Sequence, residues 1–459
     1  MRPSLARSAQ WLLLCALSLV AAGCDRRPAG PGSTAALLAL VGAVPLDPST
    51  GRAGSPSVVL LSAERIVAVE GMRTATVPPG AEEVDAEGLY LLPGLWDLHT
   101  HLAHLDDHAP PLLVTQGVLG VRDMGAVPEE MEAIRGRIES GELLGPHVVR
   151  AGPTLNGAPN AAHHRVIGTP EEARAAVADL AAAGVDLLKT HNATGRETYF
   201  ALLEAAEETG LTVGGHVPTA VSPLEACEAG QASIEHIVTL FEGTYMARFE
   251  DQRTAAQGVP EWLATEAVEL ADCFAEHGTL FVPTLRAYEL RAHWAAEHDD
   301  PDAAWRYLDD ATRAEWLADE PSDLDRREDV IALRQAVVDT GITFVRMLAE
   351  RGAPIGTGTD IAGPGLLPGF SLHAEVRLLA EAMTPAEALR AATRGPGAKA
   401  GGDPLQGRLV PGAPADLVLV GGNAFEDLAA LEDIRAVVLR GRLLDRGELD
   451  RVLDGLAGE

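Results

Sequence analysis

The middle of the chain repeats one order of hydrophobic and polar positions. A helical pattern ends at a glycine, a short apolar run follows, and a polar side chain comes directly after that run. This order occurs four times, and the polar residues that follow the apolar runs are Lys189, His216, His236 and Asp360. Apolar runs that alternate with helices are typical of parallel strands joined by right-handed crossovers. The carboxyl ends of such strands converge in a closed barrel, so we expect these four side chains at one mouth.

Short signals mark where individual elements begin. Thr169–Glu172 and Ser222–Glu225 are capping boxes with a proline at the first helical position. Toward both ends of the chain, alternating runs at 57–61, 66–69 and 437–440 predict short strands. The pattern therefore predicts an α/β fold with further strands outside the alternating region.

Length and composition narrow the class of protein. The chain has 459 residues, which suits a (β/α)8 TIM barrel with a small companion domain. Lysine and arginine total 36 and aspartate and glutamate total 67, so the formal net charge is −31. Such an acidic chain would repel phosphates, so we expect a small-molecule substrate and no nucleic-acid partner. Four cysteines without a Cys-x-x-Cys pair argue against a disulfide scaffold and against a structural zinc site.

The first residues have the anatomy of a targeting segment. Arg2 and Arg7 form a basic start, and Trp11–Ala22 is an apolar run too short to span a bilayer. Small residues then precede Cys24, which resembles the processing box of a bacterial lipoprotein, although Ala21 stands where a larger aliphatic residue is more usual. The alternative is ordinary secretory cleavage beside an incidental cysteine.

We therefore expect residues 1–23 to be a lipoprotein signal peptide and residues 24–34 to be a tether. The mature protein would be exported and lipid-anchored in the bacterial cell envelope, in the periplasm or at the cell surface. Once Cys15 is removed and Cys24 is acylated, Cys227 and Cys273 remain, and the sequence gives no reason to pair them.

A histidine pair follows a predicted strand near the start of the alternating region. Side chains alternate between the two faces of a strand, so Asp97, His99 and His101 share one face. Two imidazoles spaced in this way can bind one metal ion, and the aspartate can orient them. The alternative is a polar strand end beside His104 and His108.

Joined to the four strand-end residues, this pair resembles the amidohydrolase superfamily, in its imidazolonepropionase-like and Xaa-Pro-dipeptidase-like branch. The resemblance covers nearly all of the chain after the tether. Its motifs are PGLWDLHTH (93–101), GVLGVRDMG (117–125), GVDLLK (184–189), GGHVP (214–218), SIEH (233–236), GTGTD (356–360), TPAEALRAAT (384–393) and GRLVPGAPADLVLV (407–420).

The resemblance implies the domain organisation. A metal-dependent hydrolase barrel would occupy residues 93–394. A small β-sandwich would be built from both chain ends, with residues 35–92 as its first part and residues 395–459 as its second.

The resemblance also implies a site for two divalent metal ions, with zinc favoured by the nitrogen and oxygen donors. His99 and His101 would bind one ion with Asp360, and His216 and His236 would bind the other. Lys189 would be carbamylated by carbon dioxide and would bridge both ions. The chain has only one other lysine, Lys399. An uncharged lysine amine can react in this way, whereas a guanidinium stays protonated.

The implied activity is hydrolysis of an amide or another C–N bond by a metal-bridged hydroxide, with Asp360 moving the proton. An esterase or lactonase could use the same site. A non-catalytic lipoprotein that keeps the barrel as a binding scaffold is the alternative from another class. The sequence leaves the substrate and the oligomeric state open, including a homo-oligomer.

Other polar residues are candidates for contact with substrate. His163 and His164 follow the third strand and could reach the mouth, or they could belong to a polar loop. Arg122 could bind a substrate carboxylate or form a structural ion pair. Pro218 departs from the pattern of the dipeptidase-like members. The charged segment 286–327 could be a lid over the mouth or a solvated decoration.

Overall fold

The computed structural model describes residues 37–395 and 402–457. The expected signal peptide, the tether with Cys24, and Lys399 lie outside the described residues. None of the helices within the described ranges combines the length and the apolar character that crossing a membrane requires.

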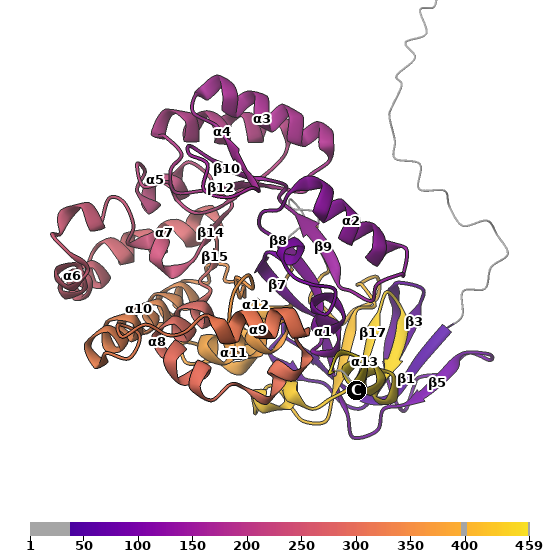
Figure 1. Cartoon of the computed structure of the whole chain (residues 1–459). Helices are drawn as coiled ribbons and strands as arrows, with labels where there is room; N and C mark the ends of the chain where they lie inside the picture. Colours follow the sequence, from indigo (N-terminus) through magenta and orange to yellow (C-terminus); the bar gives the residue numbers. More distant parts are fainter. Residues whose placement is uncertain (1–36, 396–401, 458–459) are drawn as a thin grey trace, which may run out of the picture. The chain divides into compact units, whose positions relative to one another are not determined.

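Parallel strands form the centre of the fold (Figure 1). They are β7 (Leu95–Thr100), β8 (Val118–Asp123), β9 (His147–Arg150), β10 (Thr154–Asn156), β12 (Leu188–Thr190), β13 (Val213–Gly215), β14 (Ser233–Glu235) and β15 (Leu280–Val282). A short β11 (His164–Val166) pairs with β10 outside this ring.

The pairing closes these strands into a barrel. β8 lies between β7 and β9, and β12 lies between β10 and β13, so β9 and β10 together act as the third barrel strand. The order then continues through β14 to β15. Single bridges join Phe281 to Ile355 and Thr100 to Ile361, so the segment 355–361 serves as the eighth strand. The predicted (β/α)8 barrel is confirmed.

Helices connect these strands. They are α1 (Ala109–Thr115), α2 (Pro128–Glu139), α3 (Pro170–Ala183), α4 (Arg196–Thr209), α5 (Pro223–Glu228), α7 (Glu266–His277), α10 (Glu328–Arg351), α11 (Phe370–Ala380) and α12 (Pro385–Thr393). The two predicted capping boxes are formed at Thr169 and Ser222. Gly184 and Gly352 end their helices in the left-handed conformation that glycine adopts without steric cost.

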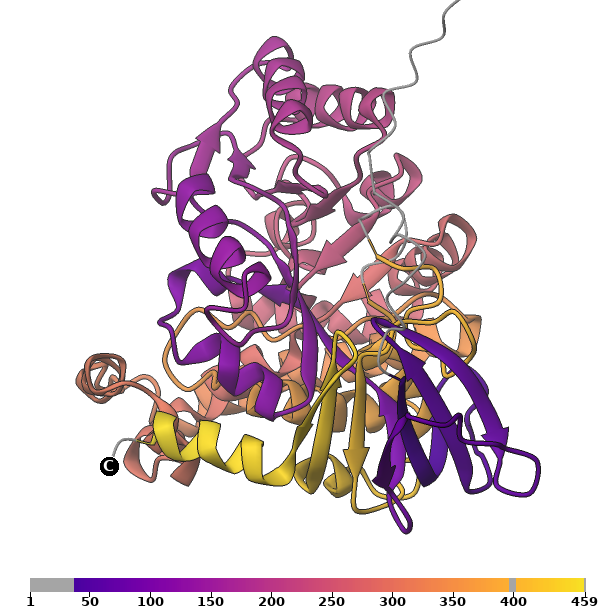
Figure 2. The same cartoon turned by 90° about the vertical axis from the view of Figure 1, so that its right-hand side faces the viewer.

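A mixed sheet from both chain ends adjoins the barrel, as predicted (Figure 2). Its strands are β1 (Leu37–Asp47), β2 (Arg52–Ala53), β3 (Ser57–Ser62), β4 (Arg65–Gly71), β5 (Glu82–Asp85), β6 (Tyr90–Pro93), β16 (Leu417–Val420), β17 (Ile434–Leu439) and β18 (Arg442–Asp445). β1 pairs with β3 from Leu37 to Ala43 and with β6 at Val44 and Pro45, so one strand joins the two halves of the sheet. Leu61 and Leu417 share the apolar core of this sheet, while Val418 belongs to the core of the barrel. The final helix is α13 (Arg446–Leu456).

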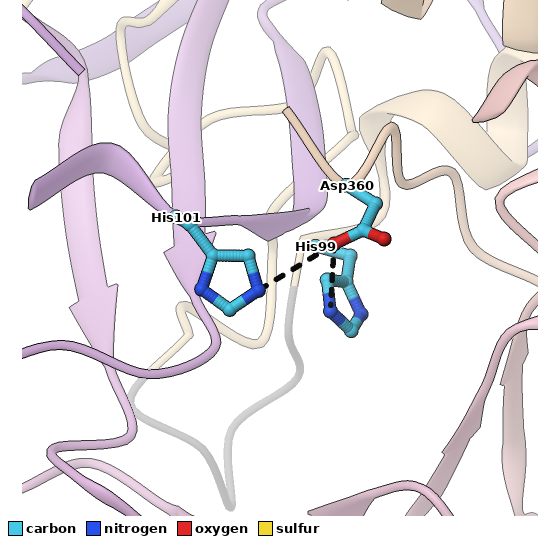
Figure 3. Close-up of side chains that lie close together, drawn as sticks. All are labelled: His99, His101 and Asp360. Carbon is cyan, nitrogen blue, oxygen red and sulfur yellow. Dashed lines mark ion pairs between the residues drawn. The ribbon is translucent and has the colours of Figure 1, made fainter. Parts of the chain in front are cut away.

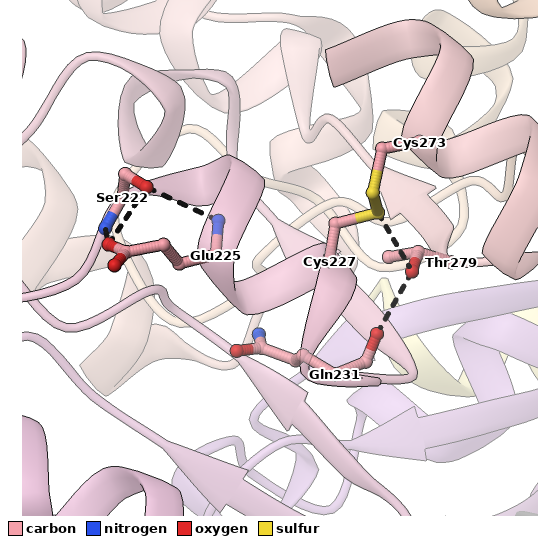
Figure 4. Close-up of a disulfide and its surroundings, with 6 residues drawn as sticks. All are labelled: Ser222, Glu225, Cys227, Gln231, Cys273 and Thr279. Carbon is pink, nitrogen blue, oxygen red and sulfur yellow. Dashed lines mark hydrogen bonds between the residues drawn. A yellow bond between two sulfur atoms is a disulfide. The ribbon is translucent and has the colours of Figure 1, made fainter. Parts of the chain in front are cut away.

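The structure corrects the expectation for the cysteines. Cys227 and Cys273 form a disulfide between α5 and α7 (Figure 4). The two residues are 46 positions apart in the sequence, so no local pattern reveals that they meet. They meet because α5 and α7 pack side by side on the outside of the barrel.

The segment 286–327 is folded and packs against the rest of the barrel. It contains most of α8 (Leu285–Asp299), a 3-10 turn at Ala303–Tyr307 and α9 (Asp310–Ala318). Trp294, Trp305 and Trp316 lie ring against ring, and Trp305 and Trp316 are buried in a core that includes Leu112. Of the two alternatives for this segment, a lid or a solvated decoration, the second does not fit, because Trp305 and Trp316 are buried.

Candidate metal centre

Three of the expected metal ligands meet at the barrel mouth. Within the described part of the chain, His99, His101 and Asp360 form a group whose ligand atoms lie within 4.8 Å of one another. One Asp360 oxygen lies 3.6 Å from His99 Nε2 and 3.4 Å from His101 Nε2 (Figure 3). Both imidazoles point toward the carboxylate, so the three side chains can bind one cation together.

Strand geometry explains this convergence. His99 belongs to β7 and His101 directly follows it, so their side chains leave on the same face. Asp97 accepts hydrogen bonds from the backbone and the hydroxyl of Thr359, the residue before Asp360. Asp97 therefore orients the neighbouring strand, because its hydrogen bonds hold Thr359 at the start of the turn that carries Asp360. Asp360 itself has a φ of 59°, an uncommon value for a residue with a side chain.

Glu235, which is not among the site residues expected from the sequence, orients His99 and belongs to a buried ion pair. His99 Nδ1 lies 3.0 Å from Glu235, which leaves Nε2 facing the centre. Glu235 also accepts a hydrogen bond from Arg122 at 2.8 Å, and both partners of this ion pair are buried. A carboxylate behind a histidine fixes its tautomer and ring orientation. The signal for Glu235 was its place at a strand end directly before His236.

This geometry bears on the two alternatives for Arg122. Its guanidinium donates to the carbonyl of Leu98, to Ser233 and to Glu235, all within the barrel. These partners and its burial show that Arg122 forms a structural ion pair, which was the second of the two alternatives. It does not face a substrate.

Lys189 lies inside the same cluster. Its Nζ is 3.1 Å from His99 Nε2, and the residue is only 2% exposed. It is the middle residue of β12, where the backbone of the next strand comes very close. A Cβ on Gly215, whose φ is 119°, would meet the Thr190 carbonyl oxygen at 2.5 Å and the Lys189 side chain at 2.8 Å. The glycine therefore leaves the space in which the lysine lies.

His216 and His236 complete the cluster on the next two strands. The His236 ring lies 4.4 Å from the His99 ring and 4.7 Å from the His216 ring, between centroids. His216 Nδ1 is 2.6 Å from the Asn192 side chain, and His236 Nδ1 is 2.9 Å from the Thr284 hydroxyl. The structure thus brings the six expected ligand residues into one contiguous group.

The protonation states suit metal binding. Burial lowers the pKa of His99 and His216 well below the usual range, and lowers that of His236 to about 3. Burial acts to raise the pKa of Asp360, but the neighbouring His236 and His101 outweigh it and hold the carboxyl ionised. Neutral imidazoles at His99, His216 and His236 and an ionised carboxylate are the forms that bind divalent cations, so these residues fit a metal centre. Burial acts to lower the pKa of His101, but its contact with Asp360 outweighs burial and raises that pKa.

His163 and His164 lie at the mouth beside this group. The His163 ring is 6.0 Å from the His101 ring, and the two neighbouring histidine rings are 4.8 Å apart. The His164 ring then approaches that of His191, which stacks on His216 at 4.2 Å. Both residues therefore lie near the cluster, and their contact with a substrate stays a prediction.

Comparison with known proteins agrees with this geometry. The model of the amidohydrolase family matches residues 90–444. An imidazolonepropionase from Rubrobacter xylanophilus is 29% identical over 428 residues, which cover 86% of this chain and 92% of that protein. The structure of bottromycin amidohydrolase has a TM-score of 0.72 and 24% identity, over 92% of this chain and 90% of that one. A Xaa-Pro dipeptidase structure has a TM-score of 0.66 and 20% identity, over 89% of this chain and all of that one. With its barrel, its cluster of histidines and these matches, the chain belongs to the amidohydrolase family of hydrolases.

Proposed function

We propose that this hydrolase cleaves an amide or another C–N bond at a centre that holds two divalent metal ions. The observation that carries the proposal is the position of Lys189, whose amine lies buried among the histidines at 3.1 Å from His99. A lysine in such a place is well positioned to act as a ligand that bridges two ions. A site for one ion would need only the group of His99, His101 and Asp360.

The six residues divide into two sets. His99, His101 and Asp360 would hold one ion, and His216 and His236 would hold the other. Burial lowers the pKa of Lys189 to about 8, so a useful fraction of its amine is uncharged at neutral pH. That amine forms an N–C bond with carbon dioxide and releases a proton. The resulting carbamate would offer two oxygens as metal ligands. Zinc suits these nitrogen and oxygen donors.

Asp360 carries the proton in this mechanism. When bound, two divalent ions lower the pKa of water and polarise a carbonyl group. Because Asp360 is ionised and stands beside His99 and His101, it accepts the proton of the attacking water and passes it to the leaving nitrogen. His163 and His164 contact the substrate at the rim of the centre.

The proposal includes export and a lipid anchor on Cys24. The arrangement of charged, apolar and small residues before Cys24 supports it. The buried disulfide between Cys227 and Cys273 supports it independently, because disulfides persist in oxidising compartments outside the cytosol. Mass spectrometry of the mature N-terminus tests this part. An unmodified N-terminus after cleavage elsewhere would contradict it.

Metal analysis and an activity screen on the zinc-loaded mature protein test the chemistry. We expect about two ions per chain and hydrolysis of at least one class among N-acyl amino acids, dipeptides and lactams. Growth with labelled bicarbonate should give a carbamate carbon signal in the 13C NMR spectrum, and Lys189→Arg should lack it. A well-folded chain that binds no metal would contradict the proposal.

The variant Asp360→Asn separates catalysis from folding. We expect turnover to fall by at least about 1,000-fold while the thermal unfolding midpoint changes little, since the amide keeps the shape of the carboxyl group. Activity near that of the unchanged protein would remove Asp360 from this role.

A further inference from the structure

A large cavity opens beside the proposed metal ligands. Its volume is about 1310 Å³, and Asp360 lies on its wall. The other walls come from the turn after β14, from α8 and α10, and from α6 (Gln252–Ala264). In the sequence these elements lie between the sixth and the eighth barrel strands, and α6 and α8 both pack against α10. The cavity is therefore continuous with the mouth of the barrel at one end.

The walls of this cavity are mostly apolar. They include Phe241, Ala256, Val259, Val337 and Leu366. Apolar walls exposed to water favour the binding of an apolar group that covers them. The volume exceeds that of typical pockets for drug-sized ligands, so an extended chain or a ring system has room.

One cation stands between the apolar walls and the proposed centre. Arg291 on α8 lines the cavity together with Asp360, and its guanidinium lies 5.2 Å from the centre of the Tyr288 ring. It is solvent-exposed in the cavity, and within residues 37–395 and 402–457 it has no carboxylate partner. In contrast, Arg334 of the same cavity pairs with Asp325 at 2.7 Å.

One of the acidic residues that line the cavity, Glu242, is engaged elsewhere. Its carboxylate accepts a hydrogen bond from the Asn192 side chain at 2.9 Å. Asn192 in turn contacts His216, so Glu242 belongs to the support of that histidine. Arg291 is thus placed to receive an anion from a ligand.

We propose that the substrate is an amphipathic amide with a free carboxylate, in which the carboxylate pairs with Arg291 and the apolar part fills the cavity between α6, α8 and α10. This inference rests on the proposed hydrolysis of an amide at the same site. N-acyl amino acids with a long acyl chain have this chemistry. Hydrolysis adds water across the amide bond, so the carbonyl carbon gains a hydroxyl and the nitrogen gains a proton.

Kinetics on the zinc-loaded protein test the role of the charge. The substrates are N-octanoylglycine and its neutral analogue N-octanoylglycinamide. We expect Arg291→Gln to raise KM for the acid by about 10- to 100-fold, with kcat nearly unchanged and with little effect on the amide. Arg291→Lys should lie in between, because it keeps the charge without the two-pronged contact. Arg174→Gln, which removes an exposed arginine paired with Glu204, is the matched control and should change neither substrate.

A second variant tests the apolar part of the site. Ala256→Trp should fill the cavity, so it should remove the preference for N-octanoylglycine over N-acetylglycine. An unchanged preference for the octanoyl chain would overturn the assignment of the cavity. Equal effects of Arg291→Gln on the acid and the amide would overturn the assignment of the charge.

Calorimetric binding separates this inference from the proposed function. If the Asp360→Asn protein binds N-octanoylglycine in a way that depends on Arg291, the inference stands even if the unchanged protein hydrolyses no amide. If the unchanged protein hydrolyses amides regardless of their charge and chain length, the hydrolase stands and this inference is wrong.

Discussion

At the scale of single residues, the interior of the barrel holds charges that support one another. Arg122 and Glu235 form a buried ion pair, and Glu235 also contacts His99. An unpaired charge in this place would be costly, because water cannot reach it. The pair therefore links the stability of the barrel to the orientation of a proposed metal ligand.

This arrangement predicts a double effect of Glu235→Gln. The amide keeps the shape but removes the charge, so Arg122 remains buried without its partner. We expect the free energy of unfolding to fall by about 3–5 kcal/mol and the affinity for zinc to fall roughly 10- to 100-fold. Urea unfolding and competition with a zinc chelator measure the two quantities.

The exposed pair of Glu204 with Arg174 provides the control. Glu204→Gln should change the free energy of unfolding by less than about 1 kcal/mol, because solvent screens surface ion pairs. Equal effects of the two substitutions on stability and on zinc affinity would show that the Glu235 contacts are unimportant.

At the scale of elements, a buried carboxyl group joins two helices. Glu375 on α11 accepts a hydrogen bond from the backbone N–H of Arg286, at the start of α8, at 2.7 Å. Its other oxygen has no partner among the described residues. Burial raises the pKa of Glu375 from 4.5 to about 8, so the carboxyl group stays protonated in the folded protein at neutral pH.

The raised pKa predicts how stability depends on pH. Between pH 4.5 and 8 the unfolded chain has lost this proton while the folded chain keeps it, so this group makes the protein less stable as pH rises. Glu375→Gln removes the titration and keeps the acceptor. We expect the variant to gain on the order of 1–3 kcal/mol relative to the unchanged protein between pH 5 and pH 8. Urea unfolding at the two pH values measures the gain.

The exposed Glu381, at the end of the same helix, is the matched control. Glu381→Gln should follow the unchanged protein at both pH values. A stability difference for Glu375→Gln that does not vary with pH would contradict the assigned protonation state.

At the scale of the whole molecule, the disulfide closes a loop that contains one barrel strand, β14, together with α6 and the first part of α7. The cross-link joins α5 to α7 across 46 positions, which restricts the unfolded chain. In the chain-entropy account, a loop of this length stabilises the folded state by about 2–4 kcal/mol.

The double variant Cys227→Ala/Cys273→Ala should therefore lose about 2–4 kcal/mol of unfolding free energy, while it binds as much added zinc as the unchanged protein. Chemical denaturation with and without a reducing agent checks this. The reducing agent should lower the stability of the unchanged protein and leave that of the double variant as it is. A double variant as stable as the unchanged protein would contradict the role of the bond.

The sequence by itself determined the strand–helix order and the positions of the chemistry. These depend on local rules: the two-residue period placed His99 and His101 on one face, and the strand ends placed Lys189 and Asp360 at one mouth. Capping boxes fixed the starts of helices for the same reason. Local conformation is encoded in neighbouring residues, so a pattern read along the chain is enough to find it.

Only the tertiary structure decided which distant residues meet. Arg122 pairs with Glu235, which is 113 positions away in the sequence. Cys227 forms a disulfide with Cys273 because their two helices pack against each other. The cavity that Arg291 lines exists because α6, α8 and α10 enclose it. Such contacts depend on how the ring of strands closes and how the helices pack on it. The period of hydrophobic residues along the chain therefore does not show which distant residues come into contact.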